Sequence, residues 1–391
     1  MIDIERVRRD LESVKRGVAA KGSAEADVDA LLRADEAWRM HTAAVERLRH
    51  EHREASERLQ TESGTRKPSH HVTELRNLSD RVREQGERLQ KVSEERMRLW
   101  KRLPNLPLED VPVGASAKEN VVRESPEKLT DYTFTPKDSL DVGTSLGIVD
   151  TERAAVASGA RFGALVGDGV LLELALVRHA IGVLSSEGYT PLLPPVLIQR
   201  ERMDAMGYLE RGADEVYETQ DNLVLVGTSE QAVGAMHADY EFPEDALPAR
   251  FVAFSSCFRR EAGSHGRDVR GILRVHQFEK VEMFSFCHPD RSRDEHAMFV
   301  QLQRRLMDDL KLSYRVVDIC TGDMGFAAAS LVDLETWFPA RRAFVETHST
   351  SNTTDFQTRR LGTKFRAKDG TRALVHAVNG TAVAIQRTLA A

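Results

Sequence analysis

Apolar residues recur every seven positions along two stretches of the first hundred residues. One seam occupies positions 31, 38, 45, 52 and 59, and the second occupies positions 75, 82, 89, 96 and 103. This repeat predicts coiled-coil helices, with His52 and Arg96 as polar seam positions. Gly64 and Pro68 between the stretches disfavour a helix interior, so the chain is expected to reverse there. The pattern predicts an antiparallel helical hairpin roughly 40–45 Å long.

The rest of the chain alternates helical and strand-like patterns after a proline-rich linker at 104–112. Apolar spacing predicts helices over 158–186, 231–240 and 293–311, and polar residues 115–137 are expected to form loops or short strands. Apolar runs predict strands over 189–198, 222–226, 250–258, 277–286, 314–318, 341–347 and 374–378. The fold class is therefore α+β, an antiparallel coiled-coil arm followed by a mostly antiparallel sheet flanked by helices. The predicted domains are residues 1–110 and 111–391.

Charge changes this picture at one place, the tip of the hairpin. The 391 residues carry a net charge of −6, which argues against a protein that coats nucleic acid with its whole surface. A dimerisation strut is the plain interpretation of such a hairpin, but a basic tip fits contact with an RNA backbone. The basic residues at or near the tip are Arg58, Arg66, Lys67, His70, His71, Arg76, Arg81 and Arg83.

Cysteine usage and hydropathy bear on the compartment. Cys257, Cys287 and Cys320 lie far apart without a CxxC pair, so neither a disulfide framework nor a thiolate zinc site is expected. No apolar run is expected to span a membrane, and the charged N-terminal stretch does not have the pattern of a signal peptide. These features predict a cytoplasmic protein without a membrane partner.

The segment 258–286 has the densest candidate chemistry. Two strand-like runs flank a glycine-containing loop, and the segment contains five arginines, with the carboxylates of Glu261, Glu279 and Glu282 on the strands. Arginine binds phosphate and carboxylate through two parallel hydrogen bonds. Since neither GxxxxGK[ST] nor GxGxxG is present, a bound ATP would be held by arginines and a metal ion. The alternative to a phosphate-binding site is a surface hairpin stabilised by ion pairs. That alternative would explain a single Arg–Glu pair, but it explains the full set of arginines and carboxylates less well.

The same segment, CFRREAGSHGRDVRGILRVHQFEKVE, resembles motif 2 of class II aminoacyl-tRNA synthetases in the form found in seryl-tRNA synthetases. Further segments resemble the family in chain order: MIDIERVRRD with the hairpin resembles the tRNA-binding arm, GYTPLLPPV motif 1, VGTSEQAV the TSE loop, and NGTAVAIQRTL motif 3. The resemblance covers essentially the whole chain. It implies a homodimeric ligase that activates L-serine with ATP and transfers it to tRNA(Ser), with tRNA(Sec) open as a second acceptor.

The resemblance also implies a role for individual residues. The catalytic residues would be Arg259 at the α-phosphate and Arg387 at the γ-phosphate. The contacts with L-serine would be Thr228, Ser229, Glu230, Glu282 and Thr381. The contacts with ATP would be Arg259, Arg260, Glu261, Val275, Glu346, Thr347, His348, Ser349 and Arg387, with Mg²⁺ on Glu346 and Ser349. The contacts with tRNA would be Arg66, Lys67 and Arg76.

The C-terminal segment departs from the family pattern. Only four residues follow Arg387, and Ala382 and Gln386 stand where the family often has glycine. A short terminal turn is expected to hold Arg387 poorly. Two alternatives therefore stay open: a duplicate synthetase that supplies activated serine or seryl-tRNA to a biosynthetic pathway, and a non-catalytic tRNA-binding relative.

Overall fold

The computed structural model describes residues 1–61, 69–210, 212–262 and 271–391. By their internal contacts, these residues form two compact units. The arm unit contains residues 2–19 and 23–104, and the sheet unit contains residue 1, residues 20–22 and residues 105–391. The predicted domain boundary at residue 110 stays a prediction.

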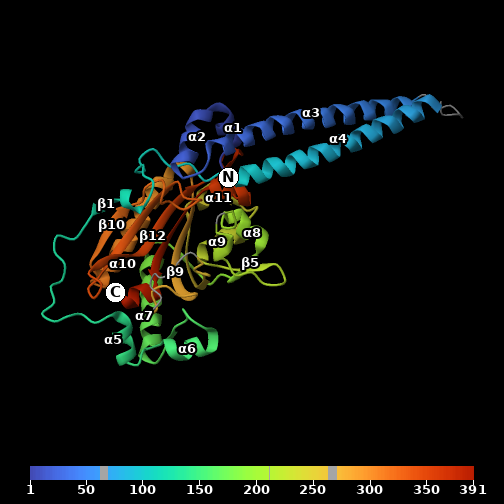
Figure 1. Cartoon of the computed structure of the whole chain (residues 1–391). Coiled ribbons are helices and arrows are strands. Elements are labelled where there is room, and N and C mark those ends of the chain that lie inside the picture. Colours follow the sequence, from blue (N-terminus) through green and yellow to red (C-terminus); the bar gives the residue numbers. More distant parts are fainter. Residues whose placement is uncertain (62–68, 211, 263–270) are drawn as a thin grey trace. The chain divides into compact units, whose positions relative to one another are not determined.

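The arm unit is helical throughout. Its helices are α1 (Ile4–Arg9), α2 (Leu11–Ala20), α3 (Glu25–Thr61) and α4 (Ser69–Lys101). The helices α3 and α4 pack side by side, and the apolar residues between them include Leu48, Ala55 and Leu78 (Figure 1). With 37 residues, α3 is about 55 Å long at 1.5 Å per residue, longer than predicted because it begins at Glu25, before the first seam residue. The predicted reversal at 62–68 lies outside the described residues.

Polar positions in the helical seam have partners on the facing helix. Arg96 donates from Nε to the fully buried carboxylate of Asp35 at 2.8 Å, and Arg8 donates to the same carboxylate. Nearer the middle of the arm, the ring of His41 contacts the Gln85 side chain at 3.3 Å. Because a buried polar group is costly without a partner, these pairs fix the register of α3 against α4.

An eight-stranded sheet forms the centre of the second unit. The order is β1-β10-β11-β12-β15-β9-β8-β4, with all neighbours antiparallel except β4 and β8. The predicted, mostly antiparallel sheet is confirmed. The strands are β1 (Val121–Glu124), β4 (Thr190–Leu192), β8 (Ala249–Phe258), β9 (Gln277–Cys287), β10 (Tyr314–Asp318), β11 (Ser330–Phe338), β12 (Ala343–Thr354) and β15 (His376–Ala384).

Two helices, α7 (Asp168–Ser186) and α10 (Ser292–Asp309), pack on one face of this sheet. Along β9, Val281 and Met283 point into the core beneath them, whereas Lys280 and Glu282 point to the opposite face. This alternation follows from the two-residue period of a strand. The face opposite the helices is polar at Lys280 and Glu282, whereas Phe284 and Phe286 farther along it pack in a second apolar cluster.

Shorter elements surround the sheet. The remaining helices are α5 (Ser139–Ser145), α6 (Thr151–Ser158), α8 (Arg200–Met206), α9 (Ser229–Met236), α11 (Phe356–Leu361) and α12 (Ile385–Ala390). The remaining strands are β2 (Val149–Asp150), β3 (Ala164–Leu165), β5 (Leu197–Gln199), β6 (Leu223–Leu225), β7 (Glu241–Pro243), β13 (Lys364–Arg366) and β14 (Arg372–Leu374).

The sequence patterns located most of the sheet strands but missed β11. The predicted strand at 189–198 is divided into β4 and β5, because Pro194 and Pro195 stand between them and proline cannot donate to a strand ladder. The predicted helix at 158–186 begins only at Asp168. This helix, α7, is 19 residues long with mean hydropathy 1.4, so one described helix does reach the length and composition of a membrane span, contrary to expectation.

Candidate active site

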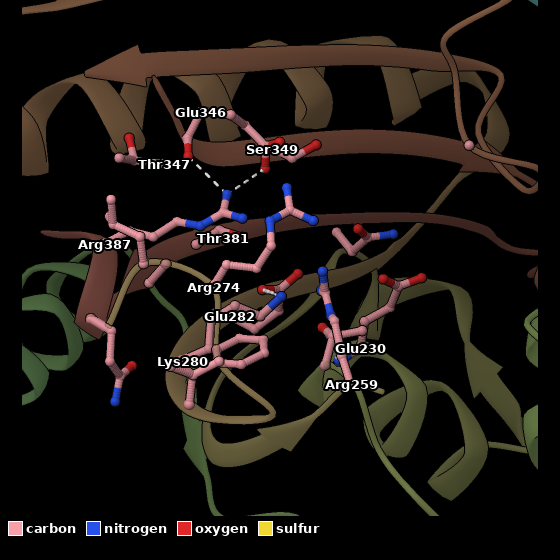
Figure 2. A pocket seen from close by; sticks show the side chains of 18 of the residues that line it. Glu230, Arg259, Arg274, Lys280, Glu282, Glu346, Thr347, Ser349, Thr381 and Arg387 are labelled. Carbon is pink, nitrogen blue, oxygen red and sulfur yellow. Dashed lines mark hydrogen bonds and ion pairs between the residues drawn. The ribbon is translucent and has the colours of Figure 1, made fainter. Parts of the chain in front are cut away.

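A cavity of about 360 Å³ opens on the polar face of the central strands. Its walls come from β9, β12 and β15, from the N-terminus of α9, and from the residues after β8 (Figure 2). The cavity is lined by Thr228, Glu230, Arg259, Glu261, Val275, Glu282, Glu346, Thr347, Ser349, Thr381 and Arg387, among others. The sheet therefore brings together eleven of the predicted substrate residues.

One end of the cavity is a buried carboxylate site. Thr228 is the N-cap of α9, and its side chain accepts a hydrogen bond from the backbone N–H of Glu230 at 3.3 Å. The Glu230 carboxylate accepts hydrogen bonds of 2.8 Å from the Tyr208 hydroxyl and from the Gln357 amide. Burial raises the pKa of Glu230, although these two hydrogen bonds favour its charged form.

Glu282 and its neighbours form the floor of the same end. The Lys280 ammonium lies 2.7 Å from the Glu282 carboxylate, and both side chains are buried (Figure 2). On the adjacent strand β15, Thr381 pairs with Glu282 in the strand register, and Asn379 lines the cavity two residues earlier. Within the described part of the chain, the buried Nδ2 of Asn379 has no hydrogen-bond partner. The floor thus offers a carboxylate, a hydroxyl and an unsatisfied amide donor.

Three guanidinium groups also line the cavity. Arg259 donates from Nε to the Gly227 carbonyl at 3.2 Å, with its guanidinium 5.3 Å from the centre of the Phe278 ring. Arg274 forms an ion pair of 2.9 Å with Glu261. Together with Arg387, these side chains offer the cavity three guanidinium groups of the kind that binds phosphate.

The third guanidinium, Arg387, is fixed by strand β12. It donates to the backbone carbonyl of Glu346 at 2.8 Å and to the Glu346 carboxylate at 3.0 Å (Figure 2). The helix that carries it, α12, buries Ile385 and Thr388. The expectation of a poorly held Arg387 was therefore wrong, because tertiary contacts stabilise a helix that is too short to be stable alone.

Three predicted residues do not line this cavity. Ser229 is buried, with its hydroxyl 2.7 Å from the Ser255 hydroxyl. The Arg260 guanidinium lies 5.7 Å from the centre of the Tyr217 ring. His348 contacts Thr347 and the Ala382 carbonyl, and burial lowers its pKa to about 4. Their substrate roles stay predictions, and the structure gives Ser229 and His348 supporting positions in the walls.

The sequence argument gave no substrate role to several polar residues of the site, four of which stand out. Tyr208, Lys280 and Asn379 line the cavity, and Gln357 holds Glu230 from behind. Lys280 and Asn379 lie in the two segments already singled out, so strand alternation from Glu282 and Thr381 could have found them. Tyr208 follows α8 and Gln357 lies on α11, two segments that carry no local signal of this kind.

Oxygen ligands for a hard cation lie beside Arg387. Glu346 and Ser349 both line the cavity, and Asp333 on β11 pairs with Ser349 in the strand register. The buried Oδ1 of Asp333 has no hydrogen-bond partner among the described residues. Burial, and next the charge of Glu346, raise the pKa of Asp333. Clustered oxygens of this kind fit Mg²⁺, which prefers carboxylate and hydroxyl ligands.

The predicted tRNA contacts belong to the arm. Arg76 is exposed on α4, and Arg66 and Lys67 lie outside the described residues. Exposed arginines at 58, 81 and 83 accompany Arg76 on the two helices. The described residues therefore include exposed arginines on both long helices of the arm, interspersed with carboxylates such as Glu54 and Asp80.

Comparisons with known proteins agree with this geometry. Residues 1–107 match the family described as "Seryl-tRNA synthetase N-terminal domain", and residues 214–391 match "tRNA synthetase class II core domain (G, H, P, S and T)". The chain is 41% identical to the serine–tRNA ligase of Thermobifida fusca, over 97% of this chain and 90% of the relative, and 40% identical to that of Streptomyces coelicolor, over 100% and 92%. The crystal structure of seryl-tRNA synthetase from Pyrococcus horikoshii complexed with ATP superimposes with a TM-score of 0.92 at 33% identity, covering 100% of this chain and 93% of that one. The chain therefore belongs to the seryl-tRNA synthetase family.

Proposed function

We propose that this chain is a serine–tRNA ligase that activates L-serine with ATP and transfers the seryl group to the 3′ end of tRNA(Ser). The observation that carries the proposal is the cavity itself, which is lined both by the guanidinium groups of Arg259, Arg274 and Arg387 and by the carboxylates of Glu230 and Glu282. Such a cavity accommodates a polyphosphate and an amino acid together. The relatives of highest identity given above carry the same activity in their names.

Activation requires charge stabilisation and positioning. The serine carboxylate attacks the α-phosphorus of ATP, so that an acyl–phosphate bond forms and the bond to pyrophosphate breaks. Negative charge grows on the α-phosphate oxygens, which Arg259 would contact, and on the pyrophosphate, which Arg387 would contact. No protein nucleophile is needed, because holding the two reactants in line supplies much of the rate enhancement.

Mg²⁺ fits beside the pyrophosphate position. Glu346 and Ser349 would hold the ion, and it would offset the charge of the leaving phosphates when bound. Glu346 is paired with Arg387 in this structure, so binding of ATP and the ion would exchange that ion pair for contacts with phosphate. Arg387 would then be free to turn toward the γ-phosphate.

The carboxylate end explains a preference for serine. Glu282 and Glu230 would receive the ammonium group, and Thr381 and Asn379 would contact the rest of the amino acid. Alanine would leave the Asn379 donor and a buried hydroxyl without partners, and sites of this kind reject such an analogue strongly. Threonine is excluded only by bulk, which is a weaker filter.

Serine-dependent exchange between ATP and pyrophosphate tests the activation step. Arg259→Ala should reduce exchange by about 100-fold or more, as removal of a charge-stabilising donor does elsewhere. Arg372→Ala is the matched control, because Arg372 is an exposed arginine on β14 that pairs with Glu241 outside the cavity. Binding of tRNA(Ser) by a folded wild-type protein without any exchange would instead support the non-catalytic alternative.

We also propose a homodimer in the cytoplasm, formed through α7. This helix packs one side on the sheet core and exposes several large apolar residues, of which Leu171 and Leu174 are 63% and 54% exposed. An exposed apolar patch of this kind marks an interaction surface. Cys257, Cys287 and Cys320 are free thiols, which fits a reducing compartment. Sedimentation should show a dimer for the wild type and a monomer for Leu171→Glu.

A further inference from the structure

The first two turns of α4 carry a group of metal-ligating side chains outside the active site. His70, His71 and Glu74 each offer one ligand atom, and these atoms all lie within 4.8 Å of one another. Among the described residues, this is the one such group of three or more histidine, cysteine or acidic side chains. None of the three lines the active-site cavity, so their close approach to one another needs an explanation of its own.

Helix geometry aims the three side chains at one point. Residues three and four apart lie on the same helix face, which places Glu74 beside both histidines. The Nδ1 of His71 lies 3.9 Å from the Glu74 carboxylate, and the two imidazole rings meet edge to face with centroids 5.4 Å apart. His70 is exposed, and the other two side chains are half-buried, so small rotations can close the group around an ion.

The donor set is that of a zinc-type ion. Imidazole nitrogen and carboxylate oxygen bind Zn²⁺ at about 2.0–2.2 Å, usually with four ligands in a tetrahedron. Ligand atoms of such a tetrahedron lie roughly 3.3–3.6 Å apart. The present separations of up to 4.8 Å therefore require each ligand atom to move by about 1 Å or less. Calcium and magnesium are disfavoured, because they take oxygen ligands.

The facing helix offers a fourth ligand. His70 and Glu74 line a cavity of about 560 Å³ together with Glu51 and Glu54 of α3. The Glu54 carboxylate lies 3.3 Å from the ring of His50 and is exposed, so it can turn toward the cavity. Arg58 and Arg81 also line this space. Three carboxylates outnumber these two guanidinium groups, and the summed charge of the lining therefore admits a cation.

We propose that His70, His71 and Glu74 bind one divalent zinc-type metal ion, with Glu54 of α3 as the fourth ligand. The ion links α3 to α4 close to the ends of the two helices, Thr61 and Ser69. Helix ends fray, and a metal-mediated link between α3 and α4 opposes fraying of these two ends. The inference concerns the arm alone and does not depend on the ligase activity.

The test uses the untagged full-length protein, stripped of metal with a chelator and titrated with Zn²⁺ alone against a chromophoric competitor. We expect one ion per chain, with affinity reduced about tenfold or more by His70→Ala, by His71→Ala and by Glu74→Gln. His52→Ala is the matched control, because His52 is an arm histidine that contacts Ser79 outside the group. Its affinity should stay within about twofold of the wild type. Circular dichroism verifies that each variant keeps its helices.

Two results would overturn the proposal. Equal Zn²⁺ affinity in the wild type and in the double variant His70→Ala/His71→Ala would place any bound ion elsewhere, and no binding at 100 µM Zn²⁺ would remove the site. Glu54→Gln tests the link between the helices and should weaken binding about threefold or more, so an unchanged affinity refutes that ligand. Binding of inorganic phosphate in place of Zn²⁺ would show that Arg58 and Arg81 define the cavity as an anion site.

Discussion

Lys21 is a buried cation whose replacement tests how the loop at 325–328 is held against the active site. It belongs to the sheet unit and is 5% exposed. Its Nζ donates to the carbonyl groups of Gly325 at 2.7 Å, Phe326 at 3.2 Å and Ala328 at 2.7 Å. Gly325 also lines the active-site cavity. Lys21→Met keeps most of the side-chain volume and removes all three hydrogen bonds.

The expected loss in free energy of unfolding depends on which of the three carbonyl groups keep another hydrogen-bond donor. Gly325 O also accepts from the backbone N–H of Ala328, and Phe326 O from that of Asn105, so the loss falls mainly on the Ala328 carbonyl. An unsatisfied buried acceptor costs about 1–3 kcal/mol, and hydrogen bonds to a charged group contribute about 1.5–3 kcal/mol each. Removal of the buried ammonium offsets part of this loss of stability, because the desolvation of the charge no longer opposes folding. We expect a net loss of about 2–3 kcal/mol.

Differential scanning calorimetry measures this loss. For a cooperative unit of more than 250 residues, about 1 kcal/mol shifts the midpoint by roughly 2 °C, so the sheet-unit transition should fall by about 4–6 °C. The control is Lys15→Met, which removes a lysine of α2 whose ammonium lies 2.7 Å from the Asp29 carboxylate. We expect a much smaller shift for it. A Lys21→Met midpoint within 1 °C of the wild type would refute the reasoning.

Two further predictions concern buried carboxylates. Because burial raises the pKa of Glu230, the wild type loses stability as pH rises from the unfolded value near 4.5 toward the higher folded value, and Glu230→Gln does not. The midpoint of Glu230→Gln relative to the wild type should therefore climb over this range and then level off, and a pH-independent difference would contradict this. Arg250 forms a two-point ion pair with Glu295, whose side chain is 5% exposed, so Arg250→Met should destabilise the unit by about 3–5 kcal/mol in thermal or urea unfolding. Arg250→Met combined with Glu295→Leu should recover most of that loss, whereas an equally unstable double variant would show that the pair itself is not responsible.

The sequence by itself determined the features that depend on local periodicity. The seven-residue seam predicted α3 and α4, because a helix repeats its buried face at that spacing. The apolar runs around the motif 2 segment predicted β8 and β9 to within a few residues. Resemblance of whole segments supplied the family, which the comparisons confirmed.

Only the tertiary structure decided which side chains meet. Asp35 does not fall on the seven-residue seam, so the pattern did not mark it, yet it is the buried ion-pair partner of Arg96, 61 positions away. Gln357 reaches Glu230 from 127 positions away, and Arg387 is held by Glu346 although its helix is too short to be stable alone. Such contacts depend on the order and register of strands in the sheet. A local pattern predicts which face of a helix or strand a residue occupies. It does not predict which distant residue contacts that face, because such contacts are fixed by the packing of the whole unit.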